Sequence, residues 1–150
     1  AQAWVKAHKD KLPKIANLFN RDGGPEPPVG ISVPQAMYDD FVKISEPIQK
    51  IRPDYPFEVK VREPRKRPTR MGGTDASVFA IEGVPTLGFT TEDFKGYDFD
   101  YGEIWHTERD LYTKNIPEYQ EHTATVTAII ALGVANLDKQ LSREGLYTEE

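Results

Sequence analysis

The sequence contains no cysteine in its 150 residues. This absence excludes a disulfide framework, a thiolate metal site and a cysteine nucleophile. It leaves the cellular compartment open, because many exported proteins also lack disulfides. A metal bound by this chain would have to use histidine, aspartate or glutamate side chains.

Long apolar runs and an excess of positive charge are missing as well. No apolar run approaches the roughly 20 residues that a membrane-spanning helix needs. The opening AQAWVKAHKDK also lacks the basic-then-apolar order of a signal peptide. The net charge is −5 at pH 7, which gives no general attraction for nucleic acid or anionic membranes. We therefore expect neither nucleic acid nor a membrane as a partner.

One segment departs from the acidic average. REPRKRPTR, at residues 62–70, contains five basic residues, with no aromatic side chains interleaved. Its two prolines indicate an exposed loop, and without aromatic residues to stack on bases we interpret it as solvated.

The patterns that are present indicate one α/β domain, for which the length is sufficient. A helix is predicted from Pro34, kinked or divided at Pro47, because apolar residues recur in alternating steps of four and three from residue 37 to 51. Further helices are predicted at residues 1–12, at 74–82 and from Pro117, and strands at 15–19, 56–63 and 84–89. This order favours a largely parallel sheet, with residues 20–30 as a loop and residues 141–150 as a frayed tail.

Three loop segments carry groups that could perform chemistry: NRDGG, GGTD and WHTERD, with Asp22, Asp75 and His106. A hard divalent metal needs oxygen and nitrogen donors that converge from different elements. Asp22 follows a predicted strand, and His106 lies in a long polar loop after another. The 84 positions between the two residues match no compact metal motif, so spacing alone is a weak signal.

Each of these residues also has an ordinary structural explanation. Asp22 before two glycines could form a turn through its own side chain, and Asp75 or Asp110 could cap a local helix or turn. His106 could simply pack against Trp105. Taken singly, the structural explanations are the more common ones.

Taken together and in this order, the segments resemble the zinc-dependent M28 peptidases, which include bacterial aminopeptidases and carboxypeptidase Q. The similar segments are AWVKAHKDKLPKIANLFNRDGG, GGTDASVFAIEGVPTLGF and WHTERDLYTKNIPEYQEHTATVTAIIALGVANL. The resemblance implies a three-layer α/β sandwich with a mixed, mostly parallel sheet. It also implies a site for two zinc ions at the strand ends and an exopeptidase activity on peptides.

The resemblance assigns roles to five residues. Asp22 stands where the family has its second aspartate ligand, and His106 where it has its final histidine ligand. Asp75 corresponds to an acid of the family that supports the ligands without binding the metal itself. Trp105 and Thr107 stand beside the histidine and would position its imidazole.

The family pattern also contains an earlier histidine, a bridging aspartate and a pair of glutamates, one of which is the general base. All of these precede the segment equivalent to AQAWVKAHKDK, where this chain begins. We therefore expect residues 1–150 to be the C-terminal part of a peptidase catalytic domain. Alone it would be inactive and hold no zinc tightly, and an uncovered sheet edge could pair with a second copy. Export is expected from the resemblance.

Two other functions remain open from the sequence. A glutaminyl-cyclase-like enzyme shares the fold but uses one zinc, with the residue at the place of Asp22 in proton transfer and an acid at the place of Asp75 in support. A relative without metals could serve as a binding module instead. The number of bound zinc ions would separate the two enzymes.

Overall fold

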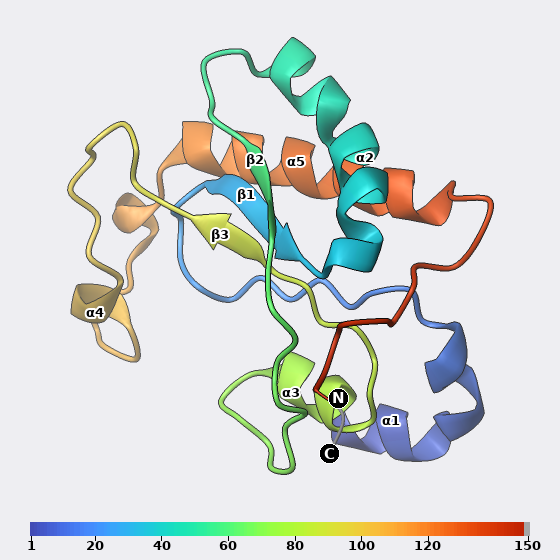
Figure 1. Ribbon diagram of the computed structural model, residues 1–150. Helices are drawn as coiled ribbons and strands as arrows, with labels where there is room; N and C mark the ends of the chain where they lie inside the picture. Colours follow the sequence, from blue (N-terminus) through green and yellow to red (C-terminus); the bar gives the residue numbers. More distant parts are fainter. Residues whose placement is uncertain (149–150) are drawn as a thin grey trace.

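A three-stranded mixed sheet lies at the centre of the computed structural model, which describes residues 1–148 (Figure 1). The strand order is β2-β1-β3, with β1 parallel to β2 and antiparallel to β3. The predicted α/β class with a mixed sheet is confirmed. In chain order the elements are α1 (Gln2–Ala7), a 3₁₀ helix (Lys9–Lys14), β1 (Pro28–Val33), a 3₁₀ helix (Gln35–Met37), α2 (Tyr38–Ile51), β2 (Glu58–Val61), α3 (Asp75–Ile81), β3 (Phe89–Thr91), α4 (Tyr101–Ile104), a 3₁₀ helix (Tyr112–Lys114) and α5 (Pro117–Ala135).

Strand β1 begins inside the segment that the sequence predicted to be a loop. Its first residue is Pro28, a position where the missing N–H costs no ladder hydrogen bond. Ile31 and Val33 are buried in the main core. At Gly30 a side chain would collide with the carbonyl oxygen of Glu58 on β2, so the close pairing of these two strands requires glycine.

The strand predicted over residues 15–19 is wrong, because this segment is extended but belongs to no ladder. It lies beside residues 85–89, with one backbone hydrogen bond from Leu18 to the carbonyl of Pro85 (2.9 Å). The Asn17 side chain donates to the carbonyl of Leu87 (3.2 Å) and accepts from its N–H (2.8 Å). The Asn17 side chain thus occupies the N–H and the carbonyl of Leu87, which a strand at residues 15–19 would need for pairing. The strand predicted at residues 84–89 pairs with β1 only from Phe89 onward.

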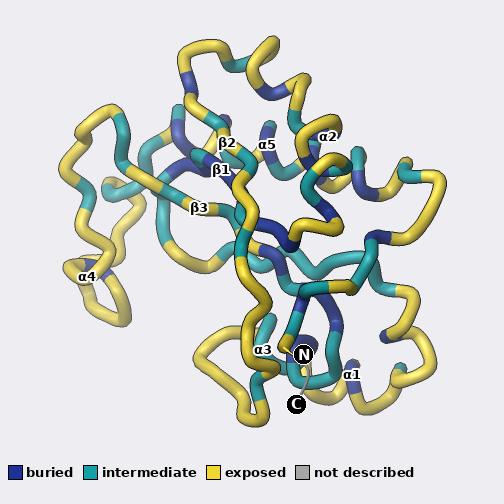
Figure 2. The backbone as a smooth tube through the Cα atoms, viewed as in Figure 1, coloured by how far each residue is buried: buried dark blue, intermediate teal, exposed yellow. Residues whose placement is uncertain are grey.

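Helices α2 and α5, which the apolar periodicity predicted, pack together behind the sheet (Figure 1). Their inward side chains join Ile31 and Val33 in the main core, and Figure 2 shows buried residues concentrated on β1 and on the neighbouring parts of both helices. Gly133 allows α5 to contact Ile44 of α2, since an added side chain would collide there. Pro47 does not divide α2. No helix within residues 1–148 has the length and apolar character needed to cross a membrane.

The predicted fraying of the tail is also wrong. Leu141 and Leu146 are buried in the main core. Arg143 donates hydrogen bonds to the carbonyls of Leu12 and Gly83, which belong to the region around a second, smaller core that includes α1 and α3. The tail therefore ties the two cores together; residues 149–150 lie outside the described part.

His122 is the one buried polar residue among the described core positions. Its Nε2 donates to the carbonyl of Pro28 (3.0 Å), and its ring stacks on Tyr55 at 3.9 Å between centroids. Its Nδ1 has no hydrogen-bond partner in residues 1–148. Burial lowers the pKa of His122, and the charges of Arg52 and Lys95 act in the same direction. The bond to the Pro28 carbonyl opposes this shift, but the net pKa is lowered, so the imidazole loses its proton more easily in the folded protein than in the unfolded chain.

This burial predicts a loss of stability as the pH falls from about 7 to about 5. The unfolded chain takes up a proton at this imidazole below about pH 6.5, and the folded protein does so only at lower pH because its pKa is lower. Protonation thus favours unfolding, with a slope of up to about 1.4 kcal/mol per pH unit. Urea unfolding at several pH values should show this slope, and His122→Phe should flatten it. The exposed-residue variant His106→Gln is the control, and an unchanged slope in His122→Phe would contradict the assignment.

Candidate functional site

Asp22 and His106 lie on loops at the end of the sheet where β1 begins and β3 ends, whereas Asp75 is the first residue of α3. Residues 20–27 lead into β1, and residues 92–116 follow β3 and contain α4. Because β1 and β3 are antiparallel, these two loops leave the sheet at the same edge. The edge therefore brings together segments that are about eighty positions apart in the sequence.

Arg21 gives residues 20–27 their fixed shape. Its Nη2 donates hydrogen bonds to the carbonyls of Gly24 and Glu26. Burial lowers the pKa of Arg21, while the nearby charges of Glu26 and Asp22 oppose this shift. The guanidinium thus cross-links the loop from inside and leaves the neighbouring Asp22 side chain exposed.

The same loop packs directly onto the α4 segment. The Tyr101 hydroxyl donates to the backbone carbonyl of Asp22 (3.1 Å). Gly24 has φ +85°, and a side chain there would lie 2.8 Å from the Tyr101 ring and 3.2 Å from the Phe99 ring. Glycine is required both by the backbone conformation and by this contact. The position of Asp22 therefore depends on the segment that carries His106.

The long loop is anchored at its start by a buried phenol. Tyr119 of α5 donates to a carboxylate oxygen of Asp93 (2.6 Å), and Asp93 accepts from the N–H groups of Tyr97 and Asp98. Burial and the bond to Asp93 raise the pKa of Tyr119 to about 12, and the same bond lowers the pKa of Asp93. These bonds fix the backbone that leads to α4.

His106 lies in a tight turn directly after α4. The helix is capped by Asp100, whose carboxylate accepts from the N–H of Gly102 (2.8 Å). His106 has φ +56°, a left-handed conformation that is uncommon for residues other than glycine. The Thr107 hydroxyl donates to the carbonyls of Glu103 (3.0 Å) and Ile104 (3.1 Å), so it closes the turn through the backbone.

The imidazole of His106 is exposed and stacks on the ring of Trp105, with 4.6 Å between the centroids. Trp105 is itself 57% exposed, so the pair projects from the surface and contributes nothing to the core. Within residues 1–148 neither His106 nor Asp22 forms a side-chain hydrogen bond or an ion pair. Both side chains are therefore free to act as ligands.

Two cavities flank the Asp22 loop. The first, of about 680 Å³, is lined by Asp22 and by the GGTD segment with Asp75 at the start of α3. The Asp75 side chain is 77% exposed, and Thr74 occupies the N-cap position of that helix. The structure thus places Asp22 and Asp75 at one cavity, whereas His106 is not part of its lining.

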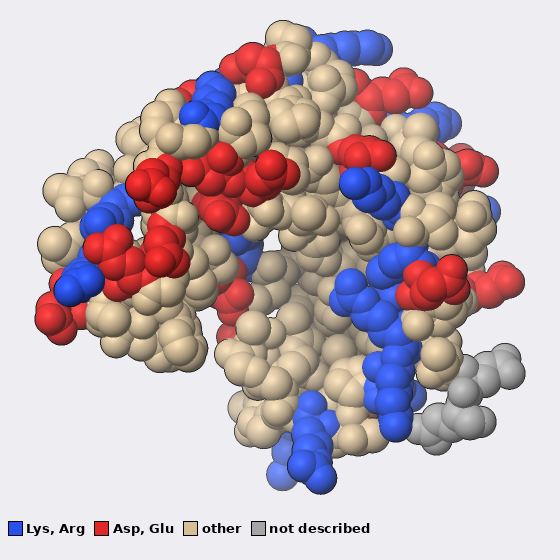
Figure 3. All heavy atoms as spheres, turned by 60° about the vertical axis from the view of Figure 1, so that its left-hand side comes forward, with Lys and Arg blue, Asp and Glu red and all other residues tan. Residues whose placement is uncertain are grey.

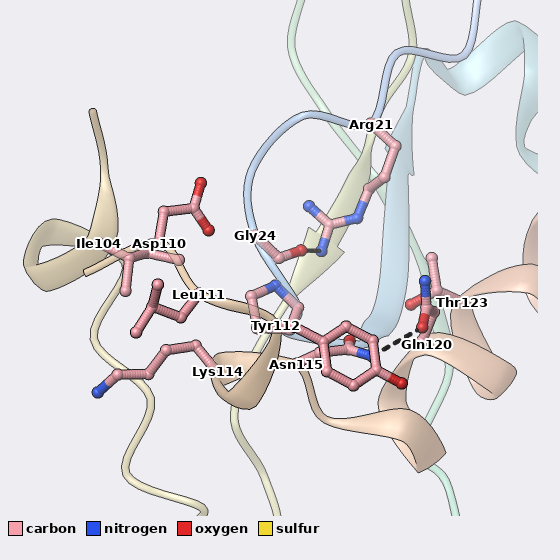
Figure 4. A pocket seen from close by; sticks show the side chains of 11 residues that line it. Arg21, Gly24, Ile104, Asp110, Leu111, Tyr112, Lys114, Asn115, Gln120 and Thr123 are labelled. Atoms are coloured by element: carbon pink, nitrogen blue, oxygen red, sulfur yellow. Dashed lines mark hydrogen bonds between the residues drawn. The ribbon is translucent and has the colours of Figure 1, made fainter. Parts of the chain in front are cut away.

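The second cavity, of about 450 Å³, lies on the other side of the loop (Figure 4). Arg21 and Gly24 form one wall, and Ile104 and Asp110, which flank the His106 turn, contribute to another. Asn115 donates to the side-chain oxygen of Gln120 (3.0 Å) in the same cavity. The sequence offered no signal for this cavity or for Arg21 and Tyr101, because their roles arise only from contacts between distant segments.

Asp22 and His106 are residue types that bind zinc, but two ligands are too few for a complete zinc site. Asp22 and His106 offer the oxygen and nitrogen donors that zinc accepts. In the part of the chain that the structure describes, no group of three or more histidine, aspartate or glutamate side chains could hold a metal ion. A complete zinc site would need further ligands in addition to these residues.

The family model for peptidase family M28 matches residues 1–130. Neither the curated proteins nor the solved structures yielded a match.

The contact between the two loops can be tested at Gly24. We expect Gly24→Ala to destabilise the protein by about 1–3 kcal/mol, because the added methyl group meets both a positive φ and two aromatic rings. Gly73→Ala is the matched control, since no atom lies within 4 Å of the added methyl group. Urea unfolding measures both variants, and equal stability of the two would show that the loops are not in contact.

Proposed function

The chain belongs to peptidase family M28, and on this premise we propose that it forms part of a zinc-dependent exopeptidase that hydrolyses terminal peptide bonds. One observation supports the proposal most directly. The Tyr101 hydroxyl joins the backbone of Asp22 to the segment that carries His106. The bond holds together the two segments that carry the proposed ligands, which are 84 positions apart in the sequence.

In this proposal Asp22 and His106 are metal ligands. Zinc, when bound, would lower the pKa of a coordinated water and polarise the scissile carbonyl. Asp22 would contribute an oxygen donor with fixed negative charge, and His106 a neutral nitrogen donor. The Trp105 ring, stacked on the imidazole, would restrict its rotation. Thr107 would not touch the imidazole but would fix the backbone turn that holds it in position.

The remaining parts of the site are also assigned by the proposal. Asp75 lines the same cavity as Asp22 and would orient a ligand or a water molecule there. The cavity of about 450 Å³ beside the His106 turn offers room for a peptide side chain. We propose that the other metal ligands and the general base come from residues outside this chain, and that the complete protein holds two zinc ions and is exported.

A glutaminyl-cyclase-like activity is the second candidate, and the shared cavity of Asp22 and Asp75 favours it. Two carboxylates at one cavity suit a proton-transfer pair, in which one acid supports the other. Metal analysis of the full-length protein separates the candidates. Two zinc ions per chain support the exopeptidase, and one supports the cyclase.

The ligand assignment predicts the effect of two substitutions in the full-length protein. Asp22→Ala and His106→Ala should each lower the zinc-dependent cleavage of an aminoacyl reporter by at least about 100-fold, because loss of a ligand harms the site more than loss of an outer partner. His8→Ala is the matched control, since His8 also stacks on a tryptophan, Trp4, at 4.6 Å. Unchanged turnover in the two ligand variants would defeat the exopeptidase proposal.

A second prediction concerns residues 1–150 alone. With at most two of the proposed ligands, this chain should bind zinc no more tightly than a Kd of about 1 μM, or about −8 kcal/mol. Isothermal titration calorimetry provides the measurement. Tight stoichiometric uptake of zinc by the isolated chain would contradict the proposed division of the ligands.

A further inference from the structure

A separate cavity lies at the opposite edge of the sheet, where β1 and β2 end and β3 begins. It has a volume of about 290 Å³, and its polar lining consists of Ser32, Arg62, Arg65, Thr86 and Thr90. Open α/β sheets bind ligands most often at the carboxyl ends of their parallel strands. Strand β1 has six residues and is therefore about 20 Å long. The cavity lies at its last residues and the Asp22 loop at its first, so the cavity is distinct from the proposed metal site.

The lining of the cavity carries positive charge and no carboxylate. Its lining includes the two arginines but no aspartate or glutamate. Neither arginine forms an ion pair within residues 1–148. Burial lowers the pKa of Arg62, and the charge of Arg65 lowers it further. Two guanidinium groups held together without a carboxylate create a potential that favours an anion.

The donors of Arg62 are partly unused. Its Nη1 donates to the carbonyl of Glu63 (3.0 Å), and its Nη2 lies 3.5 Å from the carbonyl of Leu146. Its Nε is buried and has no partner in the described residues. A guanidinium has five N–H donors, so the bonds to Glu63 and Leu146 leave N–H groups on Nη1 and Nη2 for a ligand.

Arg65 is held in place through its backbone. Its N–H donates to the carbonyl of Leu146 (3.3 Å), and its carbonyl accepts from the N–H of Thr148 (2.9 Å). Its guanidinium forms no hydrogen bond or ion pair within residues 1–148. The side chain is thus free to bind a ligand while the backbone keeps it at the cavity.

We propose that this cavity binds the phosphate group of a small molecule. A phosphate monoester carries about −1.5 to −2 charges at neutral pH, which matches two guanidinium groups better than a single carboxylate does. Guanidinium groups bind phosphate with paired hydrogen bonds, and the hydroxyls of Ser32, Thr86 and Thr90 can donate to its remaining oxygens. The cavity volume leaves room for a small organic group attached to the phosphate.

Basic side chains are also present outside the cavity. Figure 3 shows Lys and Arg side chains in a column on one face, with Asp and Glu side chains both beside this column and in a group elsewhere. Residues 62–70 contribute five basic side chains, of which only Arg62 and Arg65 line the cavity. Residues outside the lining, such as Lys66 and Arg70, therefore provide controls with the same charge.

Inorganic phosphate is the probe for the test, titrated into the full-length protein at constant ionic strength with chloride as the replacement salt. We expect saturable binding in calorimetry and a rise in Tm that chloride does not produce. Arg65→Gln should weaken phosphate binding at least 10-fold without unfolding the protein, because the Arg65 side chain is exposed and its guanidinium forms no hydrogen bond or ion pair within residues 1–148. Arg62→Gln should weaken it similarly, and Arg65→Lys should retain part of the affinity. Arg70→Gln and Lys66→Gln should bind phosphate as the unchanged protein does.

Several outcomes would overturn the proposal. Equal phosphate affinity in Arg65→Gln and the unchanged protein would remove the cavity from consideration. A loss in Arg70→Gln as large as that in Arg65→Gln would indicate a diffuse surface for polyanions. If acetate or citrate bound with an affinity equal to that of phosphate and displaced it, the cavity would be a carboxylate site. None of these results depends on zinc or on peptidase activity, so the proposal stands or falls separately from the exopeptidase function.

Discussion

Strand β1 is hydrogen-bonded to a neighbouring strand on each side, and the other features of the structure depend on this central position. β2 runs parallel along one edge, and β3 runs antiparallel along the other. Gly30 permits this arrangement, because any side chain there would collide with the backbone of β2. The buried His122 adds a bond from α5 to the first residue of the strand. The start of β1 is therefore fixed relative to α5.

The two ends of the strand carry opposite chemistry. The entry of β1 lies near Asp22 and the loop with α4, where the described chain offers carboxylates and an exposed imidazole. Its exit lies beside Arg62 and Arg65, where no carboxylate lines the cavity. Because these groups are about 20 Å apart, the charges at one end affect the other only weakly at physiological salt. The sheet thus separates a proposed cation site from a proposed anion site.

The family match and the geometry support the proposed peptidase function in different ways. The match covers residues 1–130 and assigns the chain to M28 peptidases. The geometry adds contacts that no family assignment contains, such as the Tyr101 bond to Asp22 and the Thr107 bonds that close the turn at His106. These contacts explain how the exposed loops keep a defined shape although they contribute little to the hydrophobic core.

The sequence alone determined the helices α2 and α5, since the spacing of their apolar residues reports the buried face directly. It also determined which residues could bind a metal, because only a few residue types can do so. Tertiary structure decided the sheet. The prolines before β1 suggested a loop, yet Pro28 is tolerated at the start of a strand, and the Asn17 side chain displaced the ladder expected at residues 15–19. The contact of Asp22 with Tyr101 and the meeting of Arg62 with Ser32 and Thr86 at one cavity were likewise decided only by the fold. Strand order and direction place these distant segments together and leave no local pattern in the sequence.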